Sequence, residues 1–591
     1  MRRALFGVVA LSLLTSAAPP PQLRVVPPPL GDSPVRCRTD VANDRIYNSV
    51  NSPVVVTGSR PIREVRNRPM VQGAAPPPLP APPPLMAPLP VVSAPAARVA
   101  QPFTKSFRVA PGYGPYGSRQ NSERYDGRAV ASVQDVATAP VSTFSVDVDT
   151  GAYANVRRFL NEGQPVPAEA VRTEELINYF RYDYPNPGSL AEPFSVTTDV
   201  ARTPWNPDTR LLRIGLRAYD VPTATRPRAN LVFLVDTSGS MSPADRLPLV
   251  KRALEQLTDQ LRPDDRVSIV VYAGSAGIVL EPTSNKDYVK AAIACLDAGG
   301  STAGGAGIEL AYATARASFI PGGVNRIMLA TDGDFNVGVS DRSALEAMVK
   351  RYRDDGITLT TLGFGRGNLN DAMMERIADV GNGNYSYIDS ASEARKVLDE
   401  ELSATMVTVA KDVKVQVEFN PAHVGQYRLI GYENRALAEE DFTNDAVDAG
   451  DMGAGHQVTA LYEVVSAGGR GWTPERRYEG NRRAPAPTTG GELAHVKLRY
   501  KLPDGRTSRE LSRPVPAALL ATARPPVGDM AFAVSVAAFG QKLRGDKYLG
   551  DYGWGEIRTL AGDPRGLWRQ QFVELTRLAD RGGGGAARGG L

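Results

Sequence analysis

The central part of the chain alternates short apolar runs with longer amphipathic stretches. Near-continuous apolar runs include N-L-V-F-L-V (230–235), D-R-V-S-I-V-V-Y (265–272) and N-R-I-M-L-A-T (325–331). Between them, apolar residues recur three and four positions apart, which is typical of helices with one buried face; one such stretch carries Leu247, Val250, Leu254, Leu257 and Leu261. Buried strands that alternate with helices indicate a parallel sheet covered on both faces. We therefore predict a doubly wound, mostly parallel α/β domain over residues 229–400.

The pattern differs on either side of this domain. Residues 140–228 begin like a strand, continue with two helix-like stretches and end in short alternating strands, which predicts a small α+β N-terminal module. Residues 405–525 contain strictly alternating stretches such as D-V-K-V-Q-V-E-F, which predicts an antiparallel β module with one face in solvent. Residues 526–580 have helical spacing, and the glycine-rich residues 581–591 are expected to be a disordered tail.

The N-terminus has the pattern of an export signal. Two arginines precede a short apolar run that ends in Ser16-Ala17-Ala18, so residues 1–18 are predicted to be a signal peptide. No cysteine follows to accept a lipid, and the run is too short for a comfortable membrane span. We expect a periplasmic or extracellular protein that contacts a membrane only through an uncleaved N-terminus. Residues 19–127 are rich in proline and poor in core residues, which predicts a disordered spacer.

Composition excludes several functions. The chain has 68 Lys and Arg against 64 Asp and Glu, a net charge of +4, so we expect no nucleic-acid partner. Two cysteines and three histidines argue against a zinc site of thiolates and imidazoles. Cys295 lies in a helix-like apolar stretch and is expected to be a core thiol. No phosphate-binding loop of the G-x-x-x-x-G-K-[ST] type is present, and no small-molecule substrate is evident.

Oxygen-bearing side chains follow several predicted strands. Asp236, Ser238 and Ser240 follow the first strand in D-T-S-G-S, Thr302 lies in G-G-S-T, and Asp332 ends the strand before G-D. The carboxyl ends of parallel strands form one edge of the sheet, where ligands bind. Hydroxyl and carboxylate oxygens with two charges suit a hard divalent cation, best Mg²⁺, with Mn²⁺ or Ca²⁺ as alternatives. The sequence therefore predicts one metal site with a position left for a ligand from outside.

These three pieces resemble the metal-ion-dependent adhesion site of von Willebrand factor type A domains. The resemblance implies a Rossmann-like domain that binds a protein partner through Mg²⁺, with an Asp or Glu of the partner on the ion. It assigns Asp236, Ser238 and Ser240 to the first ligand group, Thr302 to the second and Asp332 to the third. Residues of roughly 142–579 also resemble an exported bacterial subfamily with a dedicated N-terminal domain and a C-terminal domain of unknown function. We therefore expect adhesion or envelope assembly and no enzymatic activity.

Two alternatives stay open at this point. The domain is a metal-independent periplasmic scaffold if the site has lost its ion. The stretch S-V-D-V-D-T-G, with Asp147, Asp149 and Thr150, matches the D-x-D-x-T pattern of a family of phosphatases in which the first aspartate is the nucleophile. Because no Rossmann-like array follows that motif directly, a strand and turn is the favoured interpretation.

Overall fold

The computed structural model describes residue 35 and residues 123–583, apart from residues 147, 301–303, 334–341, 402–403, 405, 474–490, 504 and 506. In this described part of the chain, no helix has the length and apolar character needed to cross a lipid bilayer.

The central domain is built on a six-stranded sheet with the order β10-β9-β8-β5-β6-β7. Neighbouring strands pair in parallel, except that β7 is antiparallel to β6. The strands are β5 (Ala229–Asp236), β6 (Arg266–Tyr272), β7 (Ala276–Thr283), β8 (Val324–Thr331), β9 (Thr358–Phe364) and β10 (Tyr385–Ile388). This confirms the predicted mostly parallel α/β sheet, with the apolar run V-F-L-V inside it.

Helices cover both faces of this sheet. Successive residues of a strand point to opposite sides, so each strand contributes side chains to both covered faces. On β5, Phe233 and Val235 join the apolar cluster on the side of α4 and α5, whereas Val232 and Leu234 join the cluster on the side of α6 and α7. All residues of β5 are buried. The helices are α4 (Leu247–Gln260), α5 (Lys286–Ala294), α6 (Gly304–Ala317), α7 (Arg342–Asp354), α8 (Asp371–Val380) and α9 (Ala391–Arg395).

The segments before and after the central domain share two antiparallel sheets, with the orders β1-β12-β15-β4-β3 and β13-β2-β11-β16-β17. Phe419 lies 5.3 Å from Tyr462, and Phe194 lies 5.0 Å from Tyr500, between ring centroids, so aromatic pairs join the two sheets. The strands are β1 (Gln134–Asp135), β2 (Val141–Ser145), β3 (Phe194–Arg202), β4 (Thr209–Ala218), β11 (Thr408–Phe419), β12 (Val424–Ile430), β13 (Ala436–Leu437), β15 (Gln457–Ser466), β16 (Glu492–Lys501) and β17 (Ser508–Pro516). The central domain is thus inserted into a body made by both flanks.

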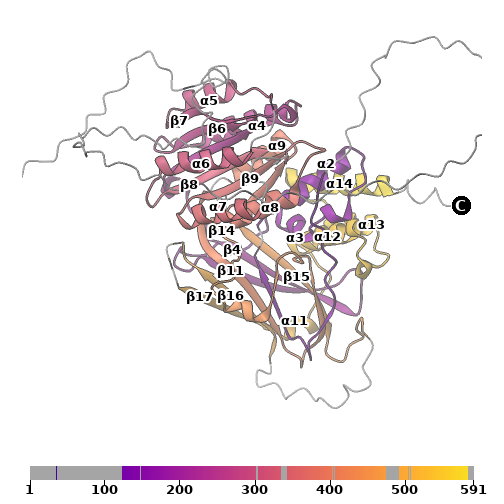
Figure 1. Ribbon diagram of the computed structural model, residues 1–591. Helices are drawn as coiled ribbons and strands as arrows, with labels where there is room; N and C mark the ends of the chain where they lie inside the picture. Colours follow the sequence, from indigo (N-terminus) through magenta and orange to yellow (C-terminus); the bar gives the residue numbers. More distant parts are fainter. Residues whose placement is uncertain are drawn as a thin grey trace, which may run out of the picture. The chain divides into compact units, whose positions relative to one another are not determined.

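A group of helices is likewise shared by the two flanks. Phe180 from the N-terminal side packs against Phe532 and Phe572, with ring centroids 4.9 and 5.8 Å away. Figure 1 shows the purple α2 and α3 beside the yellow C-terminal helices. These helices are α2 (Gly151–Asn161), α3 (Thr173–Asn178), α12 (Gly528–Arg544), α13 (Trp554–Ala561) and α14 (Leu567–Gly583). The predicted helical C-terminal segment therefore completes a core that begins in the N-terminal segment.

Three expectations about individual residues need correction. The spacer was expected to extend to residue 127, but the Glu123 side chain is 2% exposed and the Arg124 backbone donates to the Leu369 carbonyl at 3.0 Å. Val35, also within the expected spacer, forms an antiparallel bridge with Leu280 on the outer strand β7. Cys295 is disulfide-bonded rather than a core thiol. Composition did not reveal the contacts of Arg124 and Val35 because their partners, Leu369 and Leu280, are distant in sequence.

Candidate metal and partner site at the carboxyl edge of the central sheet

Asp236 is one of the two buried carboxylates of the predicted site. It ends β5, is fully buried, and accepts a hydrogen bond from the Ser238 backbone N–H at 2.9 Å. Its second carboxylate oxygen accepts from the Thr331 hydroxyl at 3.0 Å and the Tyr272 hydroxyl at 3.3 Å. Burial raises the pKa of Asp236 to about 6, and the nearby Asp332 acts in the same direction. The carboxylate is therefore fixed in place by neighbours on β6 and β8.

The loop after β5 brings two hydroxyls together. The Ser238 and Ser240 Oγ atoms lie 3.0 Å apart. The Gly239 N–H donates to the Gly300 carbonyl, and the Gly299 N–H donates to the Thr237 carbonyl, at 2.9 and 2.8 Å. The D-T-S-G-S loop thus lies against the segment that precedes Thr302. Thr302 itself lies outside the described residues.

Asp332 comes directly after β8 and is fully buried. Its carboxylate forms an ion pair with Arg246, whose side chain is 4% exposed. The same guanidinium donates to the Ser240 carbonyl at 2.7 Å and also to the Arg366 carbonyl. The structure thus places the positively charged Arg246 beside Asp332, the predicted third ligand group.

The donor set has the chemistry that a hard cation requires. Neighbouring ligands of an octahedral ion with bonds of 2.0–2.1 Å lie about 2.9 Å apart, and the two serine hydroxyls are separated by 3.0 Å. Two buried carboxylates, Asp236 and Asp332, supply negative charge near these hydroxyls. The residues therefore fit Mg²⁺, with Arg246 as a competing positive charge. In the described part of the chain, no group of three or more His, Cys, Asp or Glu side chains could hold a metal ion, so the candidate site depends on hydroxyl oxygens besides its two carboxylates.

Sequence reasoning missed the residues that support and oppose this site. Tyr272 ends β6 and Thr331 ends β8, so the strand-end rule that identified Asp236 and Asp332 could also have found them. Arg246 is the residue before α4, and neither its charge nor its position indicates that it reaches Asp332. Only the fold brings these residues together, because 86 positions separate them along the chain.

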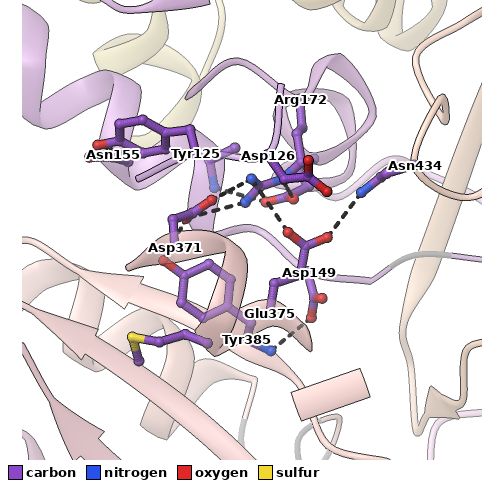
Figure 2. Close-up of polar contacts among 12 residues, drawn as sticks. Tyr125, Asp126, Asp149, Asn155, Arg172, Asp371, Glu375, Tyr385 and Asn434 are labelled. Carbon is purple, nitrogen blue, oxygen red and sulfur yellow. Dashed lines mark hydrogen bonds and ion pairs between the residues drawn. The ribbon is translucent and has the colours of Figure 1, made fainter. Parts of the chain in front are cut away.

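A second polar cluster joins the central domain to its flanks. Figure 2 shows Arg172 beside Asp371 and Glu375, with Tyr385 and Asn434 around them. Arg172, which precedes α3, binds Asp371 at 2.5 Å and Glu375 at 3.5 Å, and it also pairs with Glu175 of α3. The four side chains of this ion-pair cluster are Arg172, Glu175, Asp371 and Glu375, each at most 11% exposed. They connect α3 to α8.

Asp149 of the D-x-D-x-T motif belongs to the same region. One of its oxygens accepts from the Tyr385 backbone N–H at 2.8 Å, and the other pairs with Arg435 at 3.3 Å. The Asp149 side chain is 5% exposed. These contacts give Asp149 a structural role between β10 and the segment that precedes β13. Asp147, the nucleophile of the alternative, lies outside the described residues.

Known protein families match the central domain and both of its flanks. A von Willebrand factor type A domain model matches residues 230–401, a YfbK C-terminal model matches residues 404–581, and a von Willebrand factor model matches residues 119–213. Uncharacterized protein YfbK of Escherichia coli (strain K12) is 49% identical over 461 residues, which are 76% of this chain and 79% of that protein. The chain belongs to the YfbK family. Within it, the inserted domain is a von Willebrand factor type A domain, a type that commonly mediates protein–protein interaction.

Other similarities are confined to part of the chain or are weaker. Uncharacterized protein sll0103 of Synechocystis is 36% identical over 188 residues, covering 31% of this chain and 43% of that protein. The solved structure of a von Willebrand factor type A protein from Catenulispora acidiphila is 16% identical, with a TM-score of 0.37, and the match covers 67% of this chain and 91% of that chain.

Proposed function

We propose that this YfbK-family chain is an exported, non-enzymatic protein that binds a protein partner through a divalent cation. Asp236, Ser238, Ser240 and Asp332, here called the oxygen cluster, would hold Mg²⁺, together with Thr302 as the sequence predicts. The partner would donate an Asp or Glu oxygen to the ion. The observation that carries this proposal is the 3.0 Å separation of the two serine hydroxyls beside the buried Asp236.

Two further observations support parts of the proposal. Gly239 is exposed between the two serines, so the outer side of the loop is accessible to another protein. Cys295 is disulfide-bonded, and structural disulfides persist in oxidising compartments outside the cytoplasm. This bond agrees with the export signal predicted over residues 1–18.

A metal-independent scaffold is the second candidate, because Arg246 already neutralises part of the charge at Asp332. The two candidates differ in their response to Mg²⁺. If the oxygen cluster binds the ion, Mg²⁺ raises the melting temperature of the full chain, and EDTA reverses the change. If the domain is a scaffold without metal, neither addition has an effect.

The decisive experiment uses three proteins: the wild type, D236A and D264A. Asp264 is an exposed aspartate in the turn before β6, away from the oxygen cluster, so D264A controls for the loss of one carboxylate. Each protein is tested for Mg²⁺-induced stabilisation and for Mg²⁺-dependent, EDTA-sensitive capture of envelope proteins. We expect wild type and D264A to show both effects and D236A to show neither while it remains folded. A D236A protein with undiminished Mg²⁺ stabilisation would overturn the proposal.

A further inference from the structure

Arg246 occupies an unusual position for a residue of a cation site. It lies just before α4 and reaches the carboxylate of Asp332 and the carbonyl of Ser240. Asp332 and Ser240 are both members of the oxygen cluster; Asp332 contacts Arg246 through its carboxylate and Ser240 through its backbone carbonyl. A guanidinium there supplies the positive charge that two buried carboxylates require when no ion is bound.

The charges at the oxygen cluster allow one cation more easily than two. Asp236 and Asp332 carry two negative charges when ionised, and Arg246 reduces the sum to one. Mg²⁺ added beside a seated Arg246 would give a net charge of +1 in a buried site and would place two cations against Asp332. Like charges at such short range repel strongly in a medium of low dielectric constant.

The hydrogen bonding of the Arg246 guanidinium is incomplete. Its Nε is buried without a hydrogen-bond partner among the described residues. A buried donor without a partner carries a desolvation cost that no hydrogen bond offsets. This cost favours release of the side chain when a competing cation arrives.

One loop contacts Arg246 in addition to Asp332 and Ser240. Residues 365–370 connect β9 to α8, and the Arg366 carbonyl accepts a hydrogen bond from Arg246. Gly365 has φ +71°, and a Cβ there would collide with the Arg246 side chain. The loop thus lies directly against the arginine, and its glycine leaves the space that the arginine fills.

The N-terminal flank also binds this loop. Glu123 accepts from the Gly367 N–H at 2.8 Å, and Glu162 pairs with Arg366 at 2.8 Å. The Arg124 N–H adds a hydrogen bond to the carbonyl of Leu369 at 3.0 Å. A movement of this flank would therefore move the loop that positions Arg246.

We propose that Arg246 is a tethered counter-cation that competes with the metal ion at the oxygen cluster, and that the N-terminal flank holds it in place through loop 365–370. This inference rests on the proposed function, since it concerns the same site. It adds that cation affinity is restrained by the chain itself and is raised when the flank releases the loop.

The test measures metal binding directly in the full chain. Mg²⁺ is titrated by calorimetry, and Mn²⁺ by its electron paramagnetic resonance signal, into wild type, R246Q, R252Q and the double variant E123A/E162A, which removes both acceptors of the loop. Arg252 is exposed on α4, so R252Q controls for the loss of one arginine charge. We expect R246Q to lower the Kd at least tenfold, E123A/E162A to lower it by a smaller factor, and R252Q to leave it within about twofold.

The outcomes separate this inference from the proposed function. If wild type and R246Q bind the ion equally, or if R246Q binds it more weakly, the proposed role of Arg246 is wrong. The proposed metal site is then still supported. No binding to either protein would overturn both proposals. If R246Q is unstable, the unaltered Arg246 in E123A/E162A still permits the comparison, and an unchanged or raised Kd in that variant would contradict the tether.

Discussion

Replacing Arg172 with methionine is the most informative perturbation of the fold. Arg172 precedes α3 and is the cation of the ion-pair cluster that joins this helix to α8. Methionine keeps much of the apolar volume and removes the charge. Glu175 and Asp371 would then remain buried, with side chains 0% and 1% exposed, beside an uncharged residue.

The expected loss follows from the cost of unpaired buried charge. Removing one partner of a buried ion pair lowers stability by about 3–5 kcal/mol, because the remaining charge stays out of water. R172M leaves two acidic groups in this condition, so the upper part of that range applies. Adding E175Q to R172M should recover part of the stability, because it removes one of the two buried negative charges that lose their ion pair with Arg172.

Native-state hydrogen exchange measures this loss where it arises. A chain with several structural units need not unfold in one step, so the local opening free energy of α3 and α8 is a better quantity than a single melting temperature. We expect R172M to lower it by about 3–5 kcal/mol in both helices. R252M, an exposed substitution on α4, should change it by less than about 0.5 kcal/mol. A loss below about 1 kcal/mol in R172M, or no recovery with E175Q, would refute the reasoning.

Three further predictions concern titration and the disulfide. Burial lowers the pKa of His456 to about 4, so its contribution to stability is present above pH 6.5 and is lost as the pH falls toward 4; H456Q should flatten urea-measured stability in this window. Burial raises the pKa of Asp451 to about 7, so stability should fall as the pH rises from about 4 to 7; an unchanged slope in D451N would contradict this. Cys295 is disulfide-bonded and Cys37 is the only other cysteine, so denatured, unreduced protein should contain no thiol reactive to Ellman's reagent, and C295S should lose about 2–4 kcal/mol.

The central sheet could be predicted from the sequence because its signal is local. The run from Leu231 to Val235 is apolar on both faces, and the stretch that follows places leucines at helical spacing. Strands buried on both faces between helices have few alternative arrangements. Asp236 and Asp332 could be found for a related reason, since the edge to which they belong follows from the direction of the strands.

The pairing of the flanks could not be predicted in the same way. Alternation along β2 and β11 indicates which side chains face a core, but it does not say which strand pairs with which. In the structure Phe144 pairs with Val415 on the neighbouring strand, although the whole central domain separates these residues along the chain. The sequence suggested two separate modules because the inserted domain, residues 230–401, separates the paired strands along the chain. The contact of Arg246 could not be predicted for a comparable reason. Arg246 precedes α4, whereas its partner Asp332 follows β8, far along the chain.

Insertion of the central domain into a shared body has a consequence for the oxygen cluster. Arg172 holds α8 through Asp371, and Arg157 of α2 binds Asp389 at 2.5 Å and Glu393 at 2.7 Å. Buried ion pairs of this kind fix the end of the domain that carries α8 and α9 against the flanks. Loop 365–370 leads directly into α8, so it cannot move far without disturbing these pairs or the contacts to Glu123. If the oxygen cluster binds a cation as proposed, we expect the access of that cation to depend on the packing of the flanking body, which a freely tethered von Willebrand factor type A domain would not provide.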